Sequence, residues 1–236
     1  MRRPAALLLV LAMGGPLTEA PAASASPEPG DVRPAIEWTK IPFGARRKAQ
    51  MAAYSQRHYG ERRWALGDPR VVVEHYTAGT SMRAAWNHFA ANRPHLGERP
   101  GVCAHFLIDT DGTVYQLVNL GIRCRHAIGM NWTAIGVEHV GTSAGRILQN
   151  RVMMRASLRL TVWLMTRFGI SWGDVIGHAE ILQSSYHHER YEDWACLTHA
   201  DWNRREMRTY RRKLKRTARR LDVPIGDGPT WVPSGC

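Results

Sequence analysis

The chain has 236 residues, with hydrophobic residues at 44% and charged residues at 22%, which is the composition of an ordinary globular protein with one sizeable domain. No segment is long and apolar enough to span a bilayer, which excludes the membrane-spanning class. The formal net charge of +12 favours contact with polyanions, but charge alone does not say which polyanion.

The N-terminal residues have the pattern of a secretory signal peptide. Arg2 and Arg3 precede an apolar run over 5–13 that is too short for a membrane helix, and a small-residue triplet follows at 23–25. Pro and polar residues then indicate a linker. We expect a protein that is secreted, periplasmic or in the cell wall, with a signal peptide over 1–25, a linker over 26–43, one domain over 44–216 and a C-terminal tail over 217–236.

The first half of the domain is predicted to alternate between helix and strand. Alanines at helical spacing predict a helix over 44–59. The β-branched run 71–73 predicts a buried strand that ends at His75. Thr80 or Ser81 can then cap a second helix that ends near 91.

The second half adds a hairpin, two strands and two helices. The Asp111-Gly112 step is a strong signal for the hairpin turn. The predicted elements are a hairpin over 104–118, a strand over 133–140 with Glu138 in it, a helix over 149–167, a short strand over 175–178 ending at His178, and a basic amphipathic helix over 199–214. This alternation predicts an α/β fold with a mixed central sheet flanked by helices and a site at one sheet edge.

The four cysteines are an even number in a chain expected to reach an oxidising compartment. Cys103 and Cys124 flank the predicted hairpin, so we expect them to pair, although four cysteines allow three connectivities. Unpaired buried thiols are the alternative, and Cys196 is also a candidate metal ligand.

Two histidines and one carboxylate stand where a metal site would form. His75 and His178 lie at predicted strand ends, and Glu138 lies on another apolar strand. A catalytic zinc site needs three protein ligands and an open position for water, so a third ligand is required. Spacing alone does not choose between the candidates, which are His187, His188, Asp193, Cys196, His199 and Asp201.

Five short motifs follow one another in order between about 71 and 202. They are His75-Tyr-Thr-Ala-Gly, Ala104-His-Phe-Leu-Ile-Asp-Thr-Asp-Gly-Thr-Val-Tyr-Gln, Arg125-His-Ala-Ile-Gly-Met-Asn, Thr133-Ala-Ile-Gly-Val-Glu and Gly177-His-Ala-Glu. Together they resemble the motifs of the type-2 N-acetylmuramoyl-L-alanine amidases, a class related to a phage lysozyme and to the peptidoglycan recognition proteins. The resemblance implies a zinc-dependent hydrolase that cuts the amide between N-acetylmuramic acid and L-alanine in peptidoglycan.

The resemblance also implies a role for each matching residue. His75 and His178 occupy the places of the first two zinc ligands, and Glu138 matches the acid that activates water. The residues expected to contact substrate or to support the ligands are His126, Asn131 and Thr77.

The third ligand of the family is an Asp, Cys or His just before the last helix. His199 fits that place best, ahead of Cys196 and then of His187 or His188. Some relatives have a Tyr where this chain has Ala104, and others have a Lys two residues before the third ligand, where Leu197 stands before His199. Glu138 is therefore the main protein group expected to transfer protons.

The expected partners are peptidoglycan or muropeptides, and the charge adds anionic wall polymers. Nucleic acid is not expected, because no nucleic-acid-binding motif is recognisable. We expect a monomer. The alternative function is a non-catalytic wall-binding module, against which the joint presence of His75, His178 and Glu138 argues.

Overall fold

The computed structural model describes residues 32–228 and 231–236, so the predicted signal peptide and the first part of the predicted linker lie outside them. A six-stranded sheet has the order β1-β4-β3-β5-β2-β6. Only β3 and β4 pair antiparallel, as the predicted hairpin requires, and the other neighbours are parallel. The strands are β1 (Glu37–Trp38), β2 (Val71–Tyr76), β3 (Phe106–Ile108), β4 (Val114–Gln116), β5 (Ala134–His139) and β6 (Val175–Gly177).

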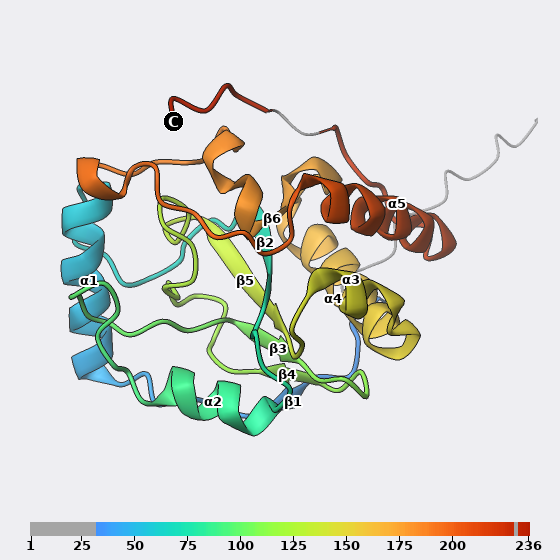
Figure 1. Cartoon of the computed structure of the whole chain (residues 1–236), viewed down its shortest axis with the longest axis horizontal. Helices are drawn as coiled ribbons and strands as arrows, with labels where there is room; N and C mark the ends of the chain where they lie inside the picture. The colour runs from blue at the N-terminus through green and yellow to red at the C-terminus, as the bar shows by residue number, and fades with distance from the viewer. Residues whose placement is uncertain (1–31, 229–230) are drawn as a thin grey trace, which may run out of the picture.

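Helices flank this sheet, which confirms the predicted fold class. They are α1 (Ala45–Tyr59), α2 (Met82–Ala90), α3 (Ala144–Gln149), α4 (Arg151–Phe168) and α5 (Arg204–Arg220), with 3-10 turns η1 (Trp172–Asp174), η2 (His178–Gln183) and η3 (Glu192–Trp194). Figure 1 shows α3, α4 and α5 gathered on one side of the sheet and α1 on the other. Among the described residues, no helix combines the length and apolarity needed to cross a membrane.

Three elements differ from the sequence-based prediction. The predicted linker contributes β1, which adds to the sheet edge by pairing with β4. The helix predicted over 149–167 is α4, but an unpredicted helix, α3, ends just before it, and the side chain of Asn150 starts α4 afresh by accepting the N–H groups of Val152 and Met153. The last helix begins at Arg204 and not at 199, and it continues past the expected domain end at 216.

The late start of α5 has a local cause. The Asn203 side chain accepts the backbone N–H groups of Arg205 and Glu206, and the Glu206 carboxylate accepts the N–H of Asn203 at 2.9 Å. This reciprocal capping box satisfies donors that the first turn leaves free. Residues 199–202 are consequently outside the helix and available to the site.

The two faces of the sheet pack against different clusters. On β2, Val72 belongs to the main core with α4 and α5, whereas Val71 and Val73 belong to a smaller cluster with Ala134 and Ile176. Side chains alternate between faces along a strand. The next odd-numbered residue of β2 after Val73 is His75, and Glu138 is an even-numbered residue of β5, as Ala134 is. The alternation therefore places the side chains of His75 and Glu138 on the same face of the sheet, away from α4.

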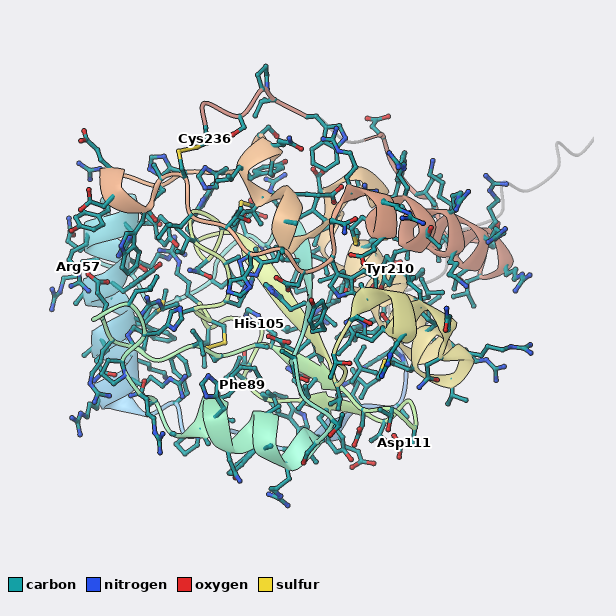
Figure 2. All side chains as sticks on the ribbon, viewed as in Figure 1. Arg57, Phe89, His105, Asp111, Tyr210 and Cys236 are labelled. Atoms are coloured by element: carbon teal, nitrogen blue, oxygen red, sulfur yellow. A yellow bond between two sulfur atoms is a disulfide. The ribbon has the colours of Figure 1, made fainter. Side chains whose placement is uncertain are left out.

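Two disulfides are present among the described residues. Cys103 pairs with Cys124, which confirms the predicted bond across the hairpin. Cys196 pairs with Cys236, so its sulfur is not free to bind a metal (Figure 2). The second bond ties the predicted C-terminal tail to the segment that precedes α5.

A buried ion pair joins α5 to the end of β6. Arg211 donates to both oxygens of Glu180, at 2.7 and 2.9 Å, and Glu180 also accepts the N–H of Gly177. We expect Arg211→Ala to lower the free energy of unfolding by about 3–5 kcal/mol, because Glu180 is then left buried without its partner. Urea unfolding measures this.

The exposed neighbour Arg212 supplies the control for this prediction. Arg212→Ala should change the free energy of unfolding by less than about 0.5 kcal/mol. Equal effects of the two substitutions would show that the buried pair does not hold β6 against α5.

Candidate metal and active site

Three side chains meet beyond the carboxyl ends of two adjacent strands. His75 lies near the end of β2, His178 directly follows β6, and Asp201 precedes α5. The two Nδ1 atoms lie 3.1 Å apart, His75 Nδ1 is 3.4 Å from Asp201 Oδ2, and His178 Nδ1 is 3.2 Å from Asp201 Oδ1. All three side chains are at least 87% buried, so the cluster is shielded from solvent.

These separations fit a tetrahedral zinc ion. Donors about 2.0–2.1 Å from such an ion lie about 3.3–3.4 Å from one another. Asp201 Oδ1 is buried without a hydrogen-bond partner, and so is Glu138 Oε2. Buried polar atoms are rarely left without a partner, so this cluster has unused capacity for a cation and its ligands.

The protonation of the cluster suits metal binding. Burial and the adjacent His178 lower the pKa of His75 to about 4, so its imidazole is neutral at pH 7. Burial alone would raise the pKa of Asp201, but the adjacent imidazoles of His178 and His75 outweigh this and hold that pKa well below the usual range. The cluster therefore offers the neutral imidazole of His75 and the carboxylate of Asp201, with His178 as the third donor.

His126 fixes which nitrogen of His75 is free. His126 Nε2 lies 3.3 Å from the carbonyl oxygen of Ala134, which can only accept, so Nε2 carries the proton. Burial holds the pKa of His126 well below its usual value, so His126 is neutral and its Nδ1 accepts. His75 Nε2 then donates to it at 3.1 Å, which leaves a lone pair on His75 Nδ1 towards His178 and Asp201.

Two glycines permit the close approaches that build the site. A Cβ on Gly136 would lie 2.7 Å from the His126 ring, and a Cβ on Gly177 would lie 1.7 Å from the carbonyl oxygen of Trp202. The second approach brings the segment before α5 against the end of β6. Trp202 is fully buried with a left-handed φ of 54°, a conformation that costs energy outside glycine and is often kept at functional sites.

Glu138 lies next to the cluster on the neighbouring strand. It is paired in register with His75 across β5 and β2. Burial, and secondarily the charge of Asp201, raise the pKa of Glu138 to about 8. Its carboxyl group lines the same cavity of about 470 Å³ as His75, His178 and Asp201.

His199 lies at the rim of this cavity. Its side chain is 76% exposed, its Nδ1 is 3.6 Å from Asp201 Oδ1, and its ring stacks on that of His178 at 5.3 Å between centroids. It is not part of the three-residue group whose donor atoms lie within 4.8 Å of one another, and His187 and His188 are not part of it either. The geometry thus favours Asp201, an open candidate in the sequence, over His199.

The other expected site residues have structural contacts. Thr77 lines the cavity, and its hydroxyl oxygen accepts N–H groups from Gly79 and Gly141 at 3.3 Å. Asn131 is fully buried, and its Oδ1 accepts the N–H groups of His126 and Ala127 at 2.8 Å. Asn131 therefore holds the segment that carries His126.

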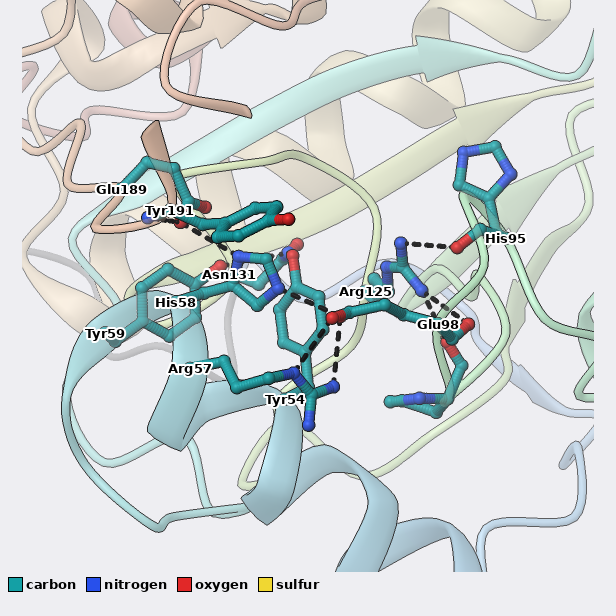
Figure 3. A network of polar contacts seen from close by, with 11 residues as sticks. Tyr54, Arg57, His58, Tyr59, His95, Glu98, Arg125, Asn131, Glu189 and Tyr191 are labelled. Atoms are coloured by element: carbon teal, nitrogen blue, oxygen red, sulfur yellow. Dashed lines mark hydrogen bonds and ion pairs between the residues drawn. The ribbon is translucent and has the colours of Figure 1, made fainter. Parts of the chain in front are cut away.

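A polar network supports one wall of the site (Figure 3). The buried ring of His58 on α1 contacts Glu189 at 2.8 Å and Glu98 at 2.9 Å. Arg125 donates to the carbonyl oxygens of Glu98 at 3.0 Å and His95 at 2.9 Å. Because His95 lines the cavity, these contacts fix that wall to α1.

The chain matches known proteins over this region. A family model described as N-acetylmuramoyl-L-alanine amidase matches residues 65–202, more than half of the chain. N-acetylmuramoyl-L-alanine amidase A of Achromobacter lyticus is 37% identical over 71 residues, which are 30% of this chain and 40% of that protein. This chain therefore matches less than half of that relative's length.

Solved structures of low identity are also similar. An endolysin N-acetylmuramoyl-L-alanine amidase, LysCS, from Clostridium intestinale is 18% identical with a TM-score of 0.47, covering 81% of this chain and 97% of that chain. Drosophila PGRP-LB is 17% identical with a TM-score of 0.42, covering 50% of this chain and 74% of that chain.

Proposed function

This chain belongs to the N-acetylmuramoyl-L-alanine amidase family, and from that premise we propose that it hydrolyses the amide between N-acetylmuramic acid and L-alanine in peptidoglycan with a zinc ion. The observation that supports this most is the cluster of His75, His178 and Asp201 beside the half-buried Glu138. A non-catalytic wall-binding module would have no need of this set. The two disulfides are consistent with an extracytoplasmic site of action.

Asp201 is the third ligand in this proposal. It is buried and anionic, and its oxygens lie at ligand spacing from both histidines, whereas His199 is mostly exposed. Because the third ligand is Asp201 and not His199, His199 has a different role in this proposal. It now stands two residues before the third ligand, where some relatives have a Lys, so its imidazole can donate to the developing oxyanion.

The chain's own groups divide the remaining chemistry. Bound zinc would supply Lewis-acid polarisation of the scissile carbonyl and a water of lowered pKa. Glu138 Oε2, which has no hydrogen-bond partner, takes a proton from the attacking water and returns it to the leaving amide nitrogen. His126 keeps His75 in the tautomer that a cation needs.

A cleavage assay on a purified muropeptide tests the proposal. We expect zinc in the purified protein, release of free stem peptide, loss of this activity on chelation, and its recovery when zinc is added back. Products cut at another bond, or full activity after complete removal of metal, would overturn the proposal.

His126→Ala is expected to weaken zinc binding about 10- to 100-fold, the usual cost of losing an outer-shell partner of a ligand. The reason is that His75 Nε2 loses its acceptor and the other tautomer becomes accessible. His126→Asn keeps an acceptor near the position of Nδ1 and should recover part of the affinity. Competition with a chelating dye measures the affinities.

The same variants separate two roles for His126. A contact with substrate would raise KM and leave zinc affinity unchanged in His126→Ala. That result would show that His126 does not set the tautomer of His75.

A further inference from the structure

A second cavity lies away from the metal site, between α5, η1 and the segment at Trp231. It has a volume of about 660 Å³, and its lining contains five arginines and Lys215 but no Asp or Glu. Ten of the 17 residues of α5 are Arg or Lys and only Glu206 is acidic, so this helix holds much of the net charge.

Most of the cations in this groove have no counter-charge. Arg211 is neutralised by its bidentate pair with Glu180. Arg204, Arg208 and Arg212 are exposed, and in the part of the chain that the structure describes none of them forms an ion pair. Positive charge left unpaired in a concave site attracts anions.

Two indole rings restrain two of the unpaired cations. The Arg204 guanidinium lies 5.0 Å from the centroid of Trp231, and the Lys215 ammonium lies 3.3 Å from that of Trp172. Such cation–π contacts restrain long side chains without cancelling their charge. Because the cations occupy ring faces, these rings are poorly placed to stack on the bases of a nucleic acid.

We propose that this groove binds a phosphodiester polymer of the cell envelope. Arg204, Arg208, Arg212 and Lys215 recur every three or four residues along α5, which places one cation per turn of about 5.4 Å on one side of the helix. That row suits an anion repeated along a flexible chain, and guanidinium groups match phosphate oxygens in bidentate geometry.

A membrane surface fits the groove less well. The apolar residues of α5, which include Met207 and Leu214, are fully buried in the core and offer nothing for insertion between lipids. The groove begins three residues after Asp201, so a polymer bound there would hold the metal cavity beside the wall. This binding goes beyond the proposed hydrolysis and does not depend on it.

The test is fluorescence anisotropy of the full chain with labelled synthetic poly(glycerol phosphate) at fixed ionic strength. We expect Arg208→Glu with Arg212→Glu to weaken binding by about tenfold or more and to flatten the dependence on salt. The matched control, Arg216→Glu with Arg219→Glu, changes the charge of the same helix equally at exposed residues outside the groove. It should weaken binding less than about threefold.

Equal losses in the two double variants would overturn the proposal, because attraction would then depend on net charge alone. Tighter binding to duplex DNA with the same number of phosphates, or to phosphatidylglycerol vesicles, would overturn it as well. Hydrolysis of a small soluble muropeptide should be the same in both double variants, which separates failure of this inference from failure of the proposed amidase.

Discussion

Asp201→Ala is expected to purify without zinc and without amidase activity, whereas His199→Ala keeps its zinc. The alanine at 201 removes the only anionic donor of the three-residue group and leaves the two imidazoles alone to hold the ion. We expect zinc affinity to fall by more than about 100-fold, which exceeds the usual effect of an outer-shell change. His199→Ala removes an exposed side chain 3.6 Å from Asp201 and should reduce kcat more than zinc content.

Metal analysis and muropeptide turnover on the same samples distinguish the two residues. His178→Ala is the positive control for lost zinc, since both ligand assignments include His178. Stoichiometric zinc in Asp201→Ala together with metal-free His199→Ala would reverse the assignment and restore the ligand that the sequence favoured.

Glu138→Gln should retain zinc and lose about 10²- to 10⁴-fold in kcat, the usual contribution of a general acid–base group. The amide has the size of the carboxyl group but cannot take a proton from water. A base must be ionised, so activity of the unaltered protein should rise with pH through the pKa of Glu138, and this limb of the kcat/KM profile should vanish in the variant. The positive charge of bound zinc would move the limb below the value of about 8 for the metal-free site.

Stability in the metal-free state checks that the variant is folded. Folding raises the pKa of Glu138 from 4.5 to about 8. The protonated carboxyl group therefore contributes to the free energy of unfolding at low pH, and this contribution is lost as the pH rises through about 8. Metal-free Glu138→Gln should therefore be more stable than the unaltered chain at pH values above about 8.

If Glu138→Gln retained more than about a tenth of kcat, proton transfer would have to be assigned to another group.

The part of the site that lies on strands could be predicted from the sequence. His75 continues the buried run of β2, and Glu138 lies on a strand of the same apolar character, so strand periodicity and parallel pairing bring them to one edge. The Cys103–Cys124 bond was equally local, because a hairpin joins its two ends.

Predicting the third ligand from the sequence requires knowing where α5 begins. A last helix that began at 199 would have His199 as its first residue. Asn203 and Glu206 have the spacing of a capping box, which indicates from the sequence that the helix begins later. With that boundary, Asp201 lies in the segment just ahead of the helix. The contact between Gly177 and Trp202 that brings this segment to His178 is tertiary and has no local signature.

The bond between Cys196 and Cys236 closes a covalent ring that contains Asp201 and all of α5. In the chain-entropy model, a ring of this size disfavours the unfolded chain by about 4 kcal/mol. Before oxidation that constraint is absent, and the segment of Asp201 is held against His178 by packing and by hydrogen bonds, which include Ala179 N–H to Asp201 O at 3.0 Å. If the chain has the proposed activity, its metal site would be held more firmly in an oxidising compartment than in the reducing interior of the cell that makes it.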